Sequence, residues 1–309
     1  MNPPPTGPRR IVVILNAGSG QGRGEALAER VERAFADRGA DAEVRLVHDG
    51  AEIESALEAA VRQSPDVIVA GGGDGTVSAV AAALLDRDIV LGVLPLGTLN
   101  HFAKDFGLPL EIEAAVAHVV GGEPVRVDVG EVNGRVFVNN SSLGLYPDIV
   151  RDRERQQKRL GRGKWLALMR ASVSVFARYP FMDVRLSVDG KDQHWRTPFV
   201  FVGNNEYRME GLALGEREGL QDGLLSLYVA QRPGRLRLLL LAVRALLGRL
   251  RQARDFAAMS AAEVVVDSRH HRLRVATDGE VTVMTPPLTY RIRRASLGVM
   301  RAGAPSEPA

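Results

Sequence analysis

Four apolar runs rich in β-branched residues alternate with helical patterns over about the first 125 residues of the chain. The runs cover residues 11–15, 42–47, 66–70 and 89–94, and segments such as EALAERVERAFADRG and AEIESALEAAVRQ lie between them. In these segments apolar residues recur at helical spacing, and parallel strands require crossover connections of this kind. The alternation therefore predicts an α/β N-terminal domain built on a parallel sheet.

The pattern changes to hairpins from about Val125 onward. The turn pairs Asn133-Gly134 and Asp189-Gly190 separate strand-like runs, and further runs such as DGLLSLYVA, AEVVVDS and RLRVATDGEVTV follow. Asn-Gly and Asp-Gly between such runs are typical of two-residue hairpin turns. These features predict a second, mostly antiparallel β domain.

The predicted domains are an α/β domain over residues 1–128 and a β-rich domain over 129–295. The last strand, about 296–303, is a candidate to return to the first domain. Two helical insertions interrupt the second domain, a charged one at 151–179 and a basic amphipathic one at 233–255.

Composition excludes several functional classes. The chain has 309 residues, 45% of them hydrophobic, so two soluble globular domains are expected. It has no cysteine, which excludes disulfides, thiolate zinc sites and a cysteine nucleophile and fits a reducing cytoplasm. The apolar run 236–247 is too short to span a membrane, the start lacks a signal peptide pattern, and a net charge of +3 does not favour nucleic-acid binding.

Three loops of small residues follow the predicted strands of the first domain. They are NAGSGQGRG at 16–24, GGGDGT at 71–76 and PLGTLNHF at 95–102. Because the carboxyl ends of parallel strands meet at one edge of the sheet, these loops are expected to form a ligand site there. Glycines and helix N-termini present N–H groups that suit phosphate, and Asp74 could hold Mg²⁺ or its waters against the phosphates.

An alternative interpretation is that each loop is a glycine turn with an aspartate cap. The presence of three such loops at one edge argues against that alternative. Gly39 is predicted to end the first helix, and Thr76 is predicted to be the N-cap of the helix after the third strand. Neither a Walker A sequence nor GxGxxG occurs, which argues against P-loop NTPases and dinucleotide dehydrogenases.

The loops resemble those of the diacylglycerol kinase catalytic-domain family, which includes bacterial lipid kinases, sphingosine kinases and ceramide kinases. The resemblance rests on GGGDGT, on Asn16-x-x-Ser19-Gly20 before it and on Gly97-Thr98-x-Asn100 after it. It continues in the same order through Asp128, FVNNSSLGLYPDIV, VGNNEY, DGLLSLYV and TDGE.

The resemblance implies a kinase that moves the γ-phosphoryl group of ATP to a lipid hydroxyl with Mg²⁺. It also implies an α/β domain like those of NAD kinase and phosphofructokinase beside a β-sandwich-like domain, with ATP in the cleft. Asp278 would act as the general base with Glu280 beside it, and Asp74 and Asp128 would support magnesium through water. The implied nucleotide-binding residues are Asn16, Ser19, Gly20, Val47, Gly72, Gly73, Asp74, Gly75, Thr76, Gly97, Thr98 and Asn100.

The sequence departs from the family pattern at two positions. His101 follows Asn100 where many relatives have aspartate, with Asp105 as a substitute one helical turn later. In GLQDGLL, Asp222 is retained but Gly219 stands at the first carboxylate of a structural magnesium site, so that site is expected to be weak or absent. Two further segments each have two interpretations. Asn204-Asn205-Glu206 touches nucleotide or forms a turn, and His270-His271 binds metal or forms an exposed hairpin tip.

The sequence thus predicts a cytoplasmic lipid kinase with peripheral contact to the inner face of the membrane. Between Arg232 and Arg254 there are seven arginines and no acidic residue, which fits either a core-covering helix or an interfacial helix on anionic lipid. The alternatives are a small-molecule kinase like NAD kinase and a nucleotide-binding regulatory protein without turnover. The lipid acceptor is not specified, and the oligomeric state is left open, with a homodimer as one option.

Overall fold

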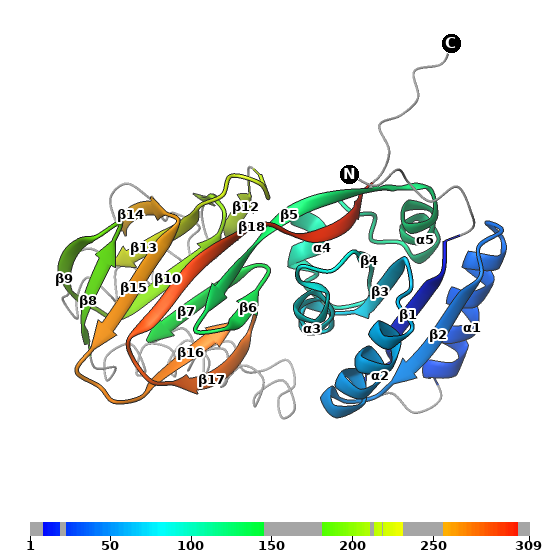
Figure 1. Ribbon diagram of the computed structural model, residues 1–309, viewed down its shortest axis with the longest axis horizontal. Helices are drawn as coiled ribbons and strands as arrows, with labels where there is room; N and C mark the ends of the chain where they lie inside the picture. Colours follow the sequence, from blue (N-terminus) through cyan, green and yellow to red (C-terminus); the bar gives the residue numbers. More distant parts are fainter. Residues whose placement is uncertain are drawn as a thin grey trace, which may run out of the picture. The chain divides into compact units, whose positions relative to one another are not determined.

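The computed structural model describes residues 9–18, 23–144, 181–210, 213–217, 219–230 and 256–301. The chain forms two compact units, labelled by their elements in Figure 1. The first unit comprises Met1–Val129 and Arg294–Ala309, and the second comprises Gly130–Arg293. Two strands, β5 (Glu123–Val132) and β18 (Leu288–Arg301), each begin in one unit and end in the other.

The first unit is an α/β domain on a parallel sheet, as predicted. Its strands run in the spatial order β2-β1-β3-β4, and the end of β18 pairs in parallel with β4. The strands are β1 (Ile11–Asn16), β2 (Ala42–Val47), β3 (Val67–Gly72) and β4 (Val90–Pro95). The helices are α1 (Arg23–Ala36), α2 (Gly50–Arg62), α3 (Asp74–Leu84), α4 (His101–Asp105) and α5 (Ile112–Gly121).

Apolar burial explains why these segments form this sheet. All six residues of β3 are buried, as expected of a central parallel strand covered on both faces. Helix α2 buries Ile53, Leu57 and Ala60, which lie on one face at helical spacing. No helix within the described ranges has the length and apolar character that crossing a membrane requires.

Local capping residues account for the start of α2 and the end of α1, but not for the start of α3. The side chain of Asp49 caps α2 by accepting a hydrogen bond from the amide of Glu52. Gly39, at φ +67°, follows α1 and lets the chain turn away, as predicted. The predicted N-cap at Thr76 is wrong, because α3 begins at Asp74 after Gly73 and the hydroxyl of Thr76 accepts a hydrogen bond from Asn16 instead.

The second unit is a sandwich of mostly antiparallel strands, again as predicted. One layer has the order β18-β15-β8-β9, the other has the order β14-β13-β10-β7-β16-β17, and β6 pairs with β5. Besides β18, the strands of the first layer are β8 (Met182–Val188), β9 (Lys191–Thr197) and β15 (Glu263–Ser268), and the strand paired with β5 is β6 (Arg135–Phe137). Those of the second layer are β7 (Asn140–Gly144), β10 (Phe199–Asn204), β13 (Leu225–Ala230), β14 (Phe256–Ala261), β16 (Leu273–Thr277) and β17 (Glu280–Met284). A separate pair comprises β11 (Tyr207–Glu210) and β12 (Ala213–Arg217).

Side chains from both layers fill one core. Leu143, Val200 and Leu227 from the second layer join Val264 and Tyr290 from the first in a single apolar cluster. Burial raises the pKa of the Tyr290 hydroxyl, which is hydrogen-bonded to Ser141. The two layers of the second unit therefore share one apolar core.

Candidate active site

The three small-residue loops begin at the same edge of the parallel sheet. Leu15 pairs with Gly71 and Gly72 pairs with Pro95, so β1, β3 and β4 end side by side. This is the edge at which open α/β sheets bind ligands. The predicted convergence of the loops is therefore present within the first unit.

Glycines in two of these loops touch each other directly. A Cβ atom on Gly97 would lie 2.5 Å from the Cα of Gly73 and 2.7 Å from Oδ1 of Asn100. The amide of Leu96 also donates a hydrogen bond to the carbonyl of Gly72, at 2.9 Å. Glycine is thus required here because the two loops pack backbone against backbone.

Other glycines of the GGGDGT loop make room for neighbouring side chains. A Cβ on Gly71 would lie 2.7 Å from Cδ1 of Leu15, and one on Gly72 would collide with Oγ1 of Thr76. Gly75, in contrast, is exposed. Much of the glycine surplus is therefore explained by packing, and Gly75 remains where a ligand could approach.

Two asparagines shape the loops. Asn16 donates from Nδ2 to Oγ1 of Thr76 at 3.2 Å, which links the loop after β1 to the loop after β3. It also accepts from the amide of Gly18 at 3.0 Å, within its own loop. Asn100, at φ 50°, accepts from the amide of Gly97 and donates to the carbonyls of Pro95 and Gly97. Both side chains fix the conformation of the loops in which nucleotide contacts were predicted.

The remaining predicted nucleotide residues differ in exposure. Thr98 is exposed. Val47 is buried at the end of β2, where its carbonyl accepts from the amide of Ala17 at 3.1 Å. Ser19 and Gly20 lie outside the described residues.

Asp74 is the site residue best suited to magnesium. It is the first residue of α3, it is partly exposed, and its Oδ1 accepts from the amide of Phe102 at 3.2 Å. Its Oδ2 has no partner among the described residues. Mg²⁺ commonly binds proteins through one or two carboxylates while keeping several waters, so this donor fits it.

Asp128 is more enclosed than Asp74. It is 3% exposed, and its Oδ1 accepts from the amide of Ala295 at 2.8 Å. Within the part of the chain that the structure describes, no three histidine, aspartate or glutamate side chains are grouped closely enough to hold a metal. A role for Asp128 through water stays a prediction.

In the second unit, Asp278 lies in the two-residue turn between β16 and β17. Asp278 and Gly279 have φ values of 48° and 89°, as in hairpin turns built from Asp-Gly. The carboxylate accepts hydrogen bonds from the amides of Val138, Asn139 and Asn140, at 2.8, 2.8 and 3.0 Å. These donors hold the carboxylate in one orientation and stabilise its negative charge.

Glu280 has a different environment from Asp278. Its Oε2 lies 2.5 Å from a guanidinium nitrogen of Arg135, and the same guanidinium donates from Nε to Oγ1 of Thr277 at 2.7 Å. Arg135 is not among the residues predicted for the site. No local pattern marks it, because its two partners lie more than a hundred positions away in the chain.

The Asn204-Asn205 pair braces the second unit. Asn204 donates to the carbonyl of Val138 at 2.9 Å, and Oδ1 of Asn205 accepts from the amide of Asp222 at 3.1 Å. The hydroxyl of Ser226 donates to the carbonyl of Asn205 at 2.8 Å. These contacts favour the structural interpretation of this pair.

The family's structural magnesium site does not fit this chain. Asp222 is exposed, and a Cβ on Gly219 would lie 2.8 Å from its Oδ1, so the two positions face each other. Only one of the two, Asp222, carries a carboxylate. One carboxylate without a second charged ligand is a poor protein site for Mg²⁺. His270 and His271 are exposed in the turn after β15 and belong to no metal-binding group of the described residues.

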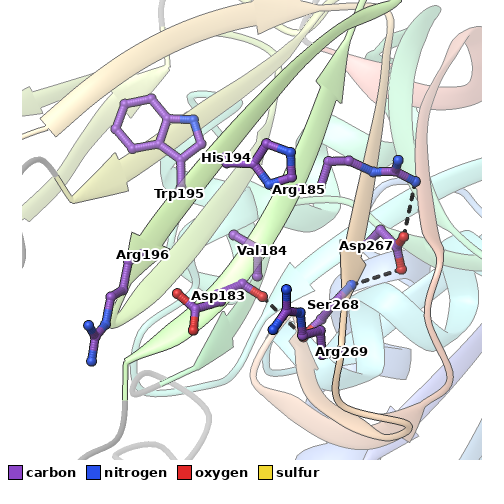
Figure 2. A pocket seen from close by; sticks show the side chains of 9 residues that line it. All are labelled: Asp183, Val184, Arg185, His194, Trp195, Arg196, Asp267, Ser268 and Arg269. Carbon is purple, nitrogen blue, oxygen red and sulfur yellow. Dashed lines mark hydrogen bonds and ion pairs between the residues drawn. The ribbon is translucent and has the colours of Figure 1, made fainter.

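A groove of about 690 Å³ lies on β8, β9 and the end of β15 (Figure 2). Its charges are partly paired with one another, since Arg185 lies 3.1 Å from Asp267. None of the predicted site residues lines it. We therefore assign the candidate functional groups to the loops of the first unit and to the Asp278 turn of the second, not to this groove.

Each of the two units matches the model of a known protein domain. Residues 10–132 match the model of the diacylglycerol kinase catalytic domain, and residues 148–301 match the YegS C-terminal NAD kinase beta sandwich-like domain. A catalytic α/β domain followed by this sandwich defines a two-domain kinase. The chain belongs to the diacylglycerol kinase catalytic domain family.

Individual relatives agree with this assignment. The chain is 32% identical over 232 residues to the "Probable lipid kinase YegS-like" of Pseudomonas syringae pv. syringae, covering 73% of this chain and 72% of the relative. It is 29% identical over 226 residues to the protein of the same name from Klebsiella pneumoniae, covering 71% and 73%. A solved structure described as a diacylglycerol kinase from Bacillus anthracis shares the fold, with a TM-score of 0.69, 19% identity and coverage of 95% and 97%.

Proposed function

We propose that the protein is an ATP-dependent lipid kinase that transfers the γ-phosphoryl group to a lipid hydroxyl. The observation that carries this proposal is the family match, which extends through both units to relatives named as lipid kinases. The match of the first unit to the diacylglycerol kinase model favours a lipid acceptor over the NAD kinase-like alternative.

The loops of the first unit suit the nucleotide. The exposed Gly75 and Thr98 lie in the two loops that Gly73 and Gly97 hold together, so backbone N–H groups can face a phosphate. The free oxygen of Asp74 would hold Mg²⁺ or its water. When bound, the metal neutralises charge on the phosphates during transfer.

Asp278 suits the acceptor end of the reaction. The lipid hydroxyl oxygen forms a bond to the γ-phosphorus, the bond from that phosphorus to the β–γ bridging oxygen breaks, and ADP leaves. The hydroxyl proton passes to a carboxylate oxygen of Asp278. Glu280, whose Oε2 is paired with Arg135, is the alternative acceptor of that proton.

A transfer assay with labelled ATP tests the proposal. The acceptors are diacylglycerol, monoacylglycerol, sphingosine, ceramide and phosphatidylglycerol, each in mixed micelles, with NAD⁺ as the small-molecule alternative. We expect label in one lipid and ATP consumption that depends on it. Label in NAD⁺ would indicate a small-molecule kinase, and nucleotide binding without consumption would indicate a regulatory protein.

The proposal includes contact with an anionic membrane surface on the cytoplasmic side. The basic segment between Arg232 and Arg254 lies outside the described residues, so the argument rests on its sequence. Each arginine near anionic lipid contributes about 1 kcal/mol, and salt screens the attraction. Replacing Arg244, Arg249 and Arg251 by glutamine should weaken sedimentation with anionic vesicles, and unchanged, salt-insensitive binding would exclude this surface.

A further inference from the structure

Arg135 holds both flanks of the turn that contains Asp278. Thr277 and Glu280 are paired across the β16–β17 hairpin, on either side of Asp278 and Gly279. The guanidinium donates to the hydroxyl of Thr277 from Nε at 2.7 Å and to Oε2 of Glu280 from a terminal nitrogen at 2.5 Å. One planar cation thus joins the two strands directly beneath the turn.

The same stretch of chain that carries Arg135 also binds the Asp278 carboxylate. Arg135 begins β6, and the amides of Val138, Asn139 and Asn140, which donate to Asp278, follow within five residues. The amide of Asp278 donates in return to the carbonyl of Asn140, at 2.9 Å. The turn and this stretch are therefore connected both at the carboxylate and at the base of the hairpin.

Burial and charge distinguish the two contacts of Arg135. Thr277 is 2% exposed, so its hydroxyl is a fixed acceptor in the protein interior. The Glu280 side chain is 65% exposed and that of Arg135 is 36% exposed, so the ion pair alone contributes little to stability. Without Arg135, however, the Glu280 carboxylate would lose its cation and the buried hydroxyl of Thr277 would lose its donor.

We infer that Arg135 is a positioning residue for Asp278. This inference rests on the proposed function of Asp278 in phosphoryl transfer. Arg135 does not touch the reacting atoms. It fixes the hairpin so that the carboxylate stays where the amides of residues 138–140 hold it. Loss of Arg135 should misplace the carboxylate slightly, and misplacement of about 1 Å can lower the rate of a reaction about a hundredfold.

The test compares Arg135→Gln with Arg135→Lys and with a matched control. Arg291 pairs with Glu263 at 2.8 Å across two strands of the same unit, and both side chains are at least half exposed, so Arg291→Gln removes a similar pair elsewhere. We expect Arg135→Gln to lower kcat about tenfold to a hundredfold while KM for ATP changes less than about twofold. Arg135→Lys should recover part of kcat, and Arg291→Gln should match the wild type.

Amide hydrogen exchange gives a readout that does not need activity. Exchange at residues 138–140 should be faster in Arg135→Gln than in the wild type and in Arg291→Gln. If Arg135→Gln is too unstable to study, Thr277→Val removes the buried acceptor and keeps the ion pair, and the same acceleration is expected.

The outcomes separate this inference from the proposed function. A value of kcat within about twofold of the wild type in Arg135→Gln, or exchange equal to that of Arg291→Gln, would overturn the positioning role. If the wild type phosphorylates no lipid, the proposed function fails, and exchange alone still decides whether Arg135 holds the turn.

Discussion

In the first unit the residues predicted to bind nucleotide are held by contacts between loop backbones, whereas in the second unit one side chain is held by backbone amides. Gly73 and Gly97 touch because neither has a Cβ atom. Asp278 is fixed because its carboxylate accepts from the amides of residues 138–140. The contact between the two loops of the first unit therefore depends on the lack of a Cβ atom at Gly73 and Gly97, and the Asp278 turn depends on the carboxylate oxygens of Asp278.

The difference predicts opposite sensitivities to substitution. Adding a methyl group to a loop glycine should disturb the first region, because there is no space for it. In the second region the damage should come from removing a charge or an acceptor oxygen, because several donors would be left without a partner. The following substitutions test this contrast.

Asp278→Asn should have the largest effect. It removes one acceptor oxygen and the proton-accepting charge, so we expect kcat to fall by about two to four orders of magnitude while nucleotide still binds. Transfer of labelled phosphate and equilibrium binding of an ATP analogue measure the two properties. Retained transfer would move the proton-accepting role to Glu280 or to another residue.

Asp74→Asn should lower kcat by about a hundredfold. The amide side chain can still accept from the amide of Phe102 through its oxygen, so the fold should be unchanged, but a neutral ligand holds magnesium less well. Circular dichroism checks the fold, and kcat measured over a range of Mg²⁺ concentrations checks the metal role. Near-normal turnover in a folded variant would contradict the assignment.

Gly97→Ala should destabilise the protein by about 1–3 kcal/mol and raise KM for ATP, because the new Cβ would press on Gly73. Gly50→Ala is the matched control, since Gly50 lies in α2 and a Cβ added there would have no heavy atom within 4 Å. That control should be neutral or slightly stabilising. Denaturant unfolding measures both, and equal stabilities would show that the loops do not need this close contact.

Gly219→Asp should give the smallest effect and concerns metal removal. In the wild type, removing Mg²⁺ from this loop with a chelator should change the free energy of unfolding by less than about 0.4 kcal/mol. That is the stabilisation that a site provides when the Mg²⁺ concentration equals its Kd. In the variant two carboxylates would face each other, so Mg²⁺ at ten times its Kd should add about 1.4 kcal/mol. Thermal unfolding with Mg²⁺ and with chelator tests this, and a wild-type loop that needs Mg²⁺ would contradict it.

Local features of the sequence predicted most of the architecture. Strand periodicity and helical spacing indicated the parallel sheet, and the Asn-Gly and Asp-Gly pairs indicated turns, which have positive φ at residues 133 and 189. The loop motifs and their order along the chain also indicated the family. These features are predictable because backbone preference and hydrophobic periodicity act over a few residues.

The tertiary structure alone decided how the site residues are held. Thr76 has the composition of an N-cap, but its hydroxyl is used by Asn16, which lies sixty positions earlier. The sequence indicated that the loops containing Gly73 and Gly97 bind a ligand, whereas the structure shows that these two glycines contact each other. Arg135 carries no local signal, because its role arises only when β6 meets the β16–β17 hairpin. Contacts between distant residues depend on how the elements pack, and no short window of sequence contains that information.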